Sequence, residues 1–109
     1  MPRSAVNPPA VRSAYAVLWS GERGSISGRL EPLADRFELS GREERVSIPY
    51  AEVVSAAIDR RNGERLQGLP VLVLRLRGRT DPLRIASMEG AGVLHELARH
   101  FAARRARTA

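Results

Sequence analysis

Hydrophobic residues alternate with other residues along residues 71–86, and this alternation predicts a β-hairpin. At 72–76 every second residue is leucine, and after a turn around Gly78 the same period of two resumes at 83–85. A period of two is that of strands with one buried face, because successive side chains point to opposite sides of a sheet. Glycine and proline between the two runs are typical of a turn.

After residue 86 the period becomes that of a helix. Hydrophobic residues recur at steps of one, three, one and three, at Val93, Leu94, Leu97, Ala98 and Phe101. This spacing places them on one stripe of a helix that faces a core. Ser87 is the predicted N-cap, and Glu89 is predicted to lie in the first turn, where the helix dipole favours an anion.

The first half of the chain contains four further segments with the composition of short strands. They are separated by turns rich in glycine and polar residues, and they are predicted at 14–19, 25–31, 36–39 and 44–48. Pro32 ends or bulges the second of them, because proline cannot donate to a central ladder. Short strands at regular spacing are typical of small antiparallel barrels and sandwiches.

Residues 49–60 fit two structures. Alanine and glutamate favour a helix, whereas Pro49 and the β-branched residues favour a strand. We predict a turn at 49–52 followed by a strand at 53–60. A polar turn at 61–65, which contains the pair Asn62-Gly63, then leads toward the final hairpin.

Together the patterns predict a mainly β protein of the α+β class, with seven antiparallel strands closed by one C-terminal helix. A chain of 109 residues is the size of one domain. We assign residues 14–104 to this domain. Residues 1–13, with three prolines and no apolar period, are predicted to be a flexible leader, and 105–109 a basic disordered tail.

The amino-acid composition limits the kinds of site and the cellular compartment that we expect. The absence of cysteine excludes disulfides and thiolate metal sites. The first residues have no apolar segment of a signal peptide, and the longest apolar run, 69–74, is far shorter than the roughly 20 residues of a spanning helix. We therefore expect a cytoplasmic protein, with peripheral attachment to the inner face of a membrane as an alternative.

The net charge of +6 is unevenly distributed, since the last fourteen residues hold four arginines and one acid. All eighteen basic residues are arginine. Arginine is preferred where phosphate or carboxylate is bound in a planar, bidentate manner. A GC-rich genome that encodes arginine in place of lysine explains the same composition.

The order of the elements and the sequence Val-Ser-Ile-Pro-Tyr-Ala-Glu-Val at 46–53 resemble the pleckstrin-homology-like (PH-like) superfold. Its bacterial and GRAM-type members often carry an Ile-Pro-Tyr-x-Glu-Ile-like sequence before the fifth strand. The resemblance covers residues 14–104. It implies a seven-stranded PH-like barrel or sandwich of two near-orthogonal sheets, with one open end closed by the helix.

The same resemblance implies a binding module whose ligands are taken by the loops after strands one, three and six. In this sequence those loops contain Arg23, Arg42 and Arg79. Phosphoinositide-binding members carry a basic residue at the end of strand one and a basic-x-Arg pair on strand two, and only Arg29 matches that pattern. A protein partner is therefore expected first, and no small-molecule substrate.

Arginines on the final hairpin form a second candidate surface. The side chains predicted to point outward are Val71, Val73, Arg75, Arg77 and Arg79, and from the neighbouring strand Arg84. One explanation is a solvated face balanced by acids such as Asp81 and Glu89. The other is a surface for an anionic partner, either nucleic acid or acidic lipid, which would bind with strong salt dependence.

Trp19 borders the first loop and has two possible roles. It either packs at the rim of the core or is an exposed anchor of the kind that interfaces favour.

No catalytic or metal-binding motif is present. His95 and His100 are five residues apart and so rotated by about 140° from each other, whereas a zinc-binding helix needs histidines four apart on one face. We expect two solvent-facing histidines. Gly90-Ala91-Gly92 lacks the lysine of a phosphate loop and is expected to be a flexible first turn. The sequence therefore predicts a protein that is not an enzyme and that needs no cofactor and no metal.

Overall fold

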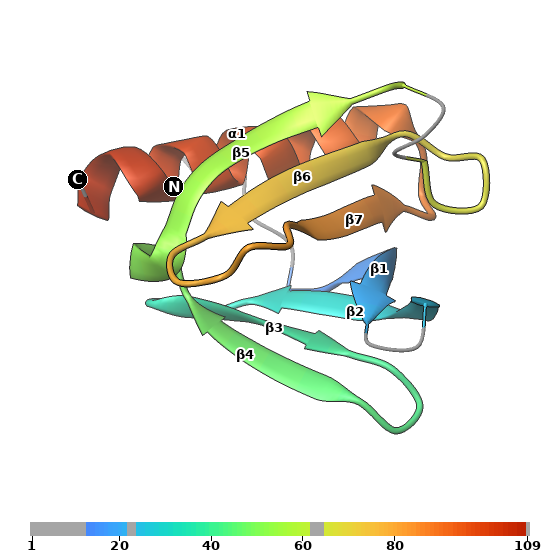
Figure 1. Cartoon of the computed structure of the whole chain (residues 1–109), viewed down its shortest axis with the longest axis horizontal. Coiled ribbons are helices and arrows are strands. Elements are labelled where there is room, and N and C mark those ends of the chain that lie inside the picture. The colour runs from blue at the N-terminus through green and yellow to red at the C-terminus, as the bar shows by residue number, and fades with distance from the viewer. Residues whose placement is uncertain (1–12, 22–23, 62–64, 109) are drawn as a thin grey trace, which may run out of the picture.

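The computed structural model describes residues 13–21, 24–61 and 65–108, and for 105–108 only the backbone. Seven strands, a short 3-10 helix and one long helix account for most of this chain (Figure 1). The strands are β1 (Tyr15–Gly21), β2 (Gly24–Pro32), β3 (Arg36–Ser40), β4 (Arg45–Pro49), β5 (Val53–Asp59), β6 (Val71–Leu76) and β7 (Leu83–Ser87). The 3-10 helix η2 is Tyr50–Glu52, and α1 is Ala91–Thr108. The prediction of seven strands and a closing helix is confirmed.

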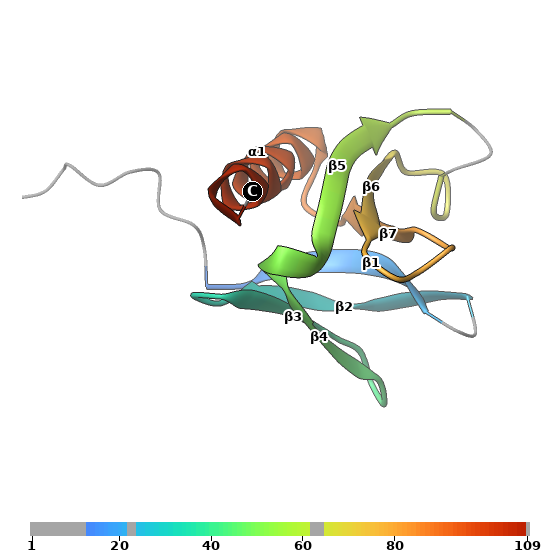
Figure 2. The same cartoon turned by 60° about the vertical axis from the view of Figure 1, so that its left-hand side comes forward.

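All neighbouring strands are antiparallel, in the order β4-β3-β2-β1-β7-β6-β5. Because β1 pairs with both β2 and β7, the two expected sheets are two halves of one sheet. The sheet curls into a half-barrel, and η2 connects its two edge strands, β4 and β5 (Figure 2). α1 lies inside the curl and packs mainly against β5 and η2.

The core fills the concave side of the sheet. Alternate residues of each strand face it, as the period of two predicts, and α1 contributes Leu94, Leu97 and Phe101. Phe37 and Phe101 meet edge to face with their ring centroids 4.8 Å apart. Every side chain of the final hairpin and helix that we predicted to be in the core is buried: Leu72, Leu74, Leu76, Leu83, Ile85, Leu97 and Phe101.

A second, smaller hydrophobic cluster lies on the outer face of the sheet. Leu18, Val71 and Ala86 are buried there, with Leu66 packed against them. Val71 was predicted to point outward and does lie on this face, but it is fully buried. Leu66, in the segment 65–70 that precedes β6, packs on this cluster, and reciprocal backbone hydrogen bonds join it to Leu69.

The start of α1 differs from the prediction. Ser87 is the last residue of β7, and its hydroxyl accepts the Glu89 N–H at 2.9 Å, so it caps a turn and not the helix. The Glu89 carboxylate accepts the Ala16 N–H at 2.8 Å and lies outside the helix. Gly90, with φ of +112°, separates this turn from α1. The predicted N-cap and the predicted acidic first turn are therefore wrong.

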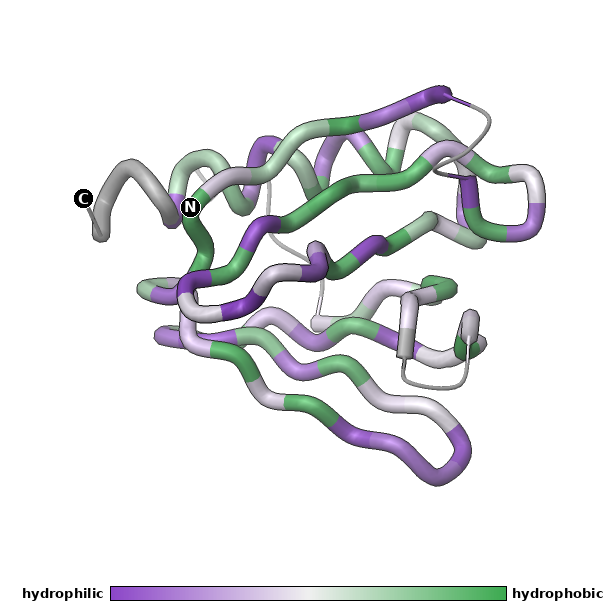
Figure 3. Tube along the Cα trace, viewed as in Figure 1, coloured by the Kyte–Doolittle hydropathy of each residue, from purple (hydrophilic) through white to green (hydrophobic). Residues whose placement is uncertain are grey.

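The choice of a strand after residue 52 is confirmed by β5. The predicted turn before it is η2, which begins directly after Pro49. A bulge between Val53 and Ser55 leaves the Val54 side chain 50% exposed. Figure 3 shows hydrophobic residues along β6 and hydrophilic residues around the β3–β4 connection. In the described part of the chain, no helix has both the length and the apolar character needed to span a membrane.

Candidate functional site

The predicted arginine surface is divided between different places on the molecule. Arg75 of β6 lies opposite Ser55 of β5, and Arg84 of β7 lies opposite Val73 of β6. Arg75 and Arg84 line one hollow of about 460 Å³ on the outer face of β5–β7. Its other lining residues are Ser55, Ala57, Ile58, Asp59, Arg61, Val73, Thr80 and Pro82. We call this the outer hollow.

Within the outer hollow Arg61 neutralises the one carboxylate. Arg61 Nη2 donates to Asp59 Oδ2 at 2.6 Å, and the Arg61 N–H donates to Oδ1 at 2.9 Å. These hydrogen bonds lower the pKa of Asp59, so the carboxylate remains charged and bound to Arg61. The positive charge of Arg75 is not balanced by any carboxylate at ion-pair distance among the described residues.

Arg77 and Arg79 lie beyond the end of β6, are exposed, and do not line the outer hollow. Arg79 lines a different hollow of about 710 Å³, together with Trp19, Ser20, Glu44, Val46 and residues 78–84. The PH-like resemblance implies ligand-binding loops after strands one, three and six. Described residues of two of these loops border this hollow: Glu44 after β3, and 78–82 after β6. Arg42 is exposed in the β3–β4 connection but does not line it, and Arg23 lies outside the described residues.

Trp19 belongs to the core. Its side chain is 2% exposed, and its Nε1–H donates to the Ser40 carbonyl at 3.1 Å. The indole therefore has its polar atom satisfied inside the fold. The alternative of an exposed anchor is wrong for this residue, and the packing alternative is confirmed.

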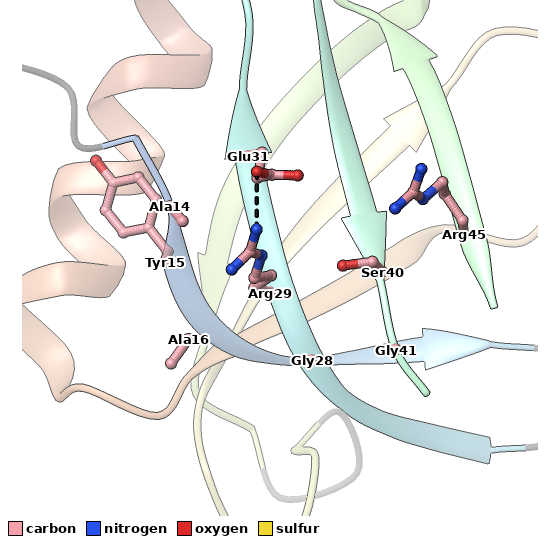
Figure 4. Close-up of a pocket in the computed structure, with 9 residues that line it drawn as sticks. All are labelled: Ala14, Tyr15, Ala16, Gly28, Arg29, Glu31, Ser40, Gly41 and Arg45. Carbon is pink, nitrogen blue, oxygen red and sulfur yellow. Dashed lines mark hydrogen bonds and ion pairs between the residues drawn. The ribbon is translucent and has the colours of Figure 1, made fainter. Parts of the chain in front are cut away.

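Arg29 lies on the other half of the sheet, far along the strand order from the outer hollow. It projects from β2 and pairs with Glu31 at 3.1 Å. Both residues line a hollow of about 600 Å³, shown in Figure 4, whose other lining residues are Ala14, Tyr15, Ala16, Gly28, Ser40, Gly41 and Arg45. Arg29 is the one residue of the predicted set that borders this hollow.

The free edge of β5 adjoins a further hollow that sequence patterns did not indicate. It has a volume of about 450 Å³ and lies between β5 and α1. Its lining is Ala56, Ala57, Ile58, His95, Ala98, Arg99 and Ala102. We call it the helix-side hollow. Arg60 Nη2 lies 3.0 Å from His95 Nε2 and donates to it, since arginine carries donors only.

A buried polar pair joins η2 to α1. Tyr50 Oη and His100 Nε2 are 2.8 Å apart, and the Arg104 guanidinium lies 5.3 Å from the centre of the Tyr50 ring. Burial raises the pKa of Tyr50 to about 12 and lowers the pKa of His100, which Arg104 lowers further. His100 is 9% exposed, so the expectation of two solvent-facing histidines is wrong for this residue. His100 directly precedes Phe101 on the edge of the apolar stripe, which is the signal that could have indicated burial.

Comparison of the whole sequence with protein-family models and with curated proteins finds no match. Within the described ranges, no three side chains of the metal-binding types come together. The two histidines bond to Arg60 and Tyr50 respectively. The structure therefore contains three candidate binding features: an edge strand between two hollows, a divided arginine surface, and the hollow of Figure 4.

Proposed function

We propose that this chain is a non-catalytic binding module of the PH-like type that docks an extended segment of a partner protein along the free edge of β5. One observation carries the proposal: β5 ends the strand order, and a hollow lies on each side of it. Ala57 and Ile58 line both hollows. The strand order and the closing helix support the PH-like assignment, and the lack of cysteine supports a cytoplasmic setting.

If a peptide adds to the sheet as a strand beside β5, its side chains reach both hollows. An extended peptide that pairs with an edge strand satisfies its backbone hydrogen bonds on that strand and sends alternate side chains to opposite faces. On one face those side chains enter the helix-side hollow, which is walled by Ala98 and Ala102 of α1. On the other face they meet Arg75 and Arg84 in the outer hollow. The favoured partner segment alternates small apolar residues with acidic residues.

The composition of β5 also favours an open edge. Exposed edges are usually protected by proline, by lysine or by several charged residues. β5 has no proline, and its only charged residue, Asp59, is bound to Arg61 at one end. At the other end the bulge at Val54 interrupts the pairing with β6. The middle of the strand, residues 55–58, is therefore uncharged, and it is the part that we propose pairs with the partner segment.

Selection of phage-displayed random peptides on the full chain, followed by affinity measurements, tests this function. Ala102→Trp fills the helix-side hollow from an exposed helix position and is expected to weaken the selected peptides about tenfold or more, which is about 1.4 kcal/mol. Ala103→Trp is the matched control, because Ala103 is also exposed on α1 but does not line the hollow. Acidic residues at alternate positions are expected among the selected peptides.

Three results would contradict the proposal. The first is that no peptide is selected, and the second is that both tryptophan variants bind equally well. The third comes from light scattering coupled to size exclusion: a dimer that Ala102→Trp dissociates would mean that a second copy of this chain occupies the edge.

A second candidate function is docking on an anionic surface, either nucleic acid or acidic lipid. The observation that favours it is the exposure of Arg75, Arg77 and Arg79, none of which forms an ion pair with a described carboxylate. It differs from the first candidate in using Arg77 and Arg79, which lie outside the outer hollow.

A further inference from the structure

Four small or basic residues form a row across the outer face of β1–β4. Ala16 lies opposite Arg29, Arg29 opposite Ser40, and Ser40 opposite Arg45. Side chains at directly paired positions of an antiparallel sheet point to the same face. The row therefore places one serine between two arginines, with an alanine at its end.

Gly28, next to Arg29 in β2, allows the backbones of β2 and β3 to pack closely beside this row. A Cβ atom at Gly28 would lie 1.7 Å from the Ser40 carbonyl oxygen, so β2 and the end of β3 can approach only because Gly28 has no side chain. A Cβ at Gly41 would instead meet the Ile26 side chain, which can shift more easily than backbone. Gly28 and Gly41 line the hollow of about 600 Å³ together with Ala14, Ala16 and the larger side chains already named. Figure 4 shows the Ser40 side chain between Arg29 and Arg45.

The two guanidiniums can reach one ligand. Neighbouring strands are about 4.8 Å apart, so the Cα atoms of Arg29 and Arg45 are separated by roughly 10 Å, with Ser40 between them. Each guanidinium carries five N–H donors, and the serine hydroxyl adds another. A flat carboxylate has two oxygens, whereas a phosphate group presents three in a pyramid and matches donors that arrive from three strands.

The only carboxylate in the lining competes weakly. Glu31 pairs with Arg29 at 3.1 Å, and the two side chains are 33% and 59% exposed. Exposed pairs of this kind contribute little to stability and exchange readily for a better ligand. Arg45 has no ion-pair partner among the described carboxylates.

We propose that this hollow is a phosphate-binding site, in which Arg29, Ser40 and Arg45 hold the dianion of free phosphate or of a small phosphomonoester. The site shares no residue with the edge of β5, so phosphate binding can be tested independently of the proposed peptide docking. Affinity for a phosphomonoester falls below about pH 6, where the ester takes up its second proton; free phosphate takes up its second proton at higher pH, so its affinity falls earlier.

The test is a titration of the full chain with inorganic phosphate and with glycerol 3-phosphate, monitored by ¹H–¹⁵N NMR. Ionic strength is held constant, and a titration with chloride is the reference. We expect saturable shifts around residues 28–31, 40–41 and 45. Arg29→Gln and Arg45→Gln are each expected to weaken binding about tenfold. Tighter binding of the ester identifies a phosphomonoester, and equal binding identifies free phosphate.

Two matched controls make the test specific. Arg36→Gln removes the same charge from the same face, but Arg36 pairs with Asp35 and lies outside the hollow, so binding is expected to be unchanged. Glu31→Gln releases Arg29 and is expected to tighten binding a few-fold, a gain that misfolding cannot produce. Glu38→Gln, on the neighbouring strand, has the same charge change and is expected to give little gain.

Shifts that do not saturate would overturn the proposal, because they indicate diffuse attraction to a basic protein. Equal weakening by Arg36→Gln and Arg45→Gln would overturn it as well. So would equal tightening by Glu31→Gln and Glu38→Gln.

Discussion

Tyr50 and His100 connect η2 to α1 through one buried hydrogen bond of 2.8 Å. The bond can form in either histidine tautomer: Nε2 accepts from the Tyr50 hydroxyl in one and donates to the Tyr50 oxygen in the other. Tyrosine remains protonated well above neutral pH, since burial raises its pKa to about 12. Burial and the Arg104 charge lower the pKa of His100, so the neutral imidazole is favoured in the folded state. Protonation of His100 is therefore less favourable in the folded state than in the unfolded chain.

This pair predicts that folding stability falls in weak acid. The unfolded chain binds a proton to His100 near pH 6.5, whereas the folded chain does so only at lower pH. Between these two values the unfolded state holds more protons, so the free energy of unfolding decreases as pH falls. Urea unfolding between pH 8 and pH 4 measures the effect. We expect this part of the pH dependence to be lost in His100→Gln and retained in His95→Gln; an unchanged profile in His100→Gln would show that another group is responsible.

At the scale of elements, the approach of β2 to the end of β3 depends on Gly28. Gly28→Ala is expected to destabilise the fold by about 3 kcal/mol, toward the upper end for overpacking, because the clash is with the backbone oxygen of Ser40. Gly92 in α1 is the control, since a Cβ there meets nothing within 4 Å and alanine favours a helix by up to about 1 kcal/mol. Thermal unfolding of both variants checks the prediction, and equal stability of the two would contradict it.

The elements themselves could be predicted from the period of the sequence, because each strand has one buried face. The hairpin of β6 and β7 and the stripe of α1 are the clearest examples. Burial of Val71 could not be predicted in this way, because it depends on where the preceding connection places Leu66. The free edge of β5 depends on the strand order, which periodicity does not contain. Of the candidate residues, Arg75 and Arg84 come together as expected, whereas Arg29 lies on the other half of the sheet.

At the scale of the whole molecule, curling one sheet produces two outward surfaces with different chemistry. The β5–β7 half carries arginines beside an edge strand, and the β1–β4 half carries the proposed phosphate site. The halves are joined by the pairing of β1 with β7, from Val17 to Trp19. If both proposals hold, one small domain binds a protein segment and an anion at the same time, since the two surfaces share no residue.

The alternative function, docking on an anionic surface, depends on the whole molecule, because the net charge of +6 attracts anions to all of it. If the arginine surface binds nucleic acid, affinity must fall steeply with salt, and Arg75→Glu combined with Arg77→Glu should reduce the slope of log affinity against log salt by about 2. A variant ending at residue 104 separates this surface from the basic end of α1, which includes Arg105 and Arg107. Gel shifts on DNA and RNA, and sedimentation with acidic and neutral vesicles, measure the two arms. Absence of binding at low ionic strength in both arms would remove this alternative and leave the edge of β5 as the docking surface.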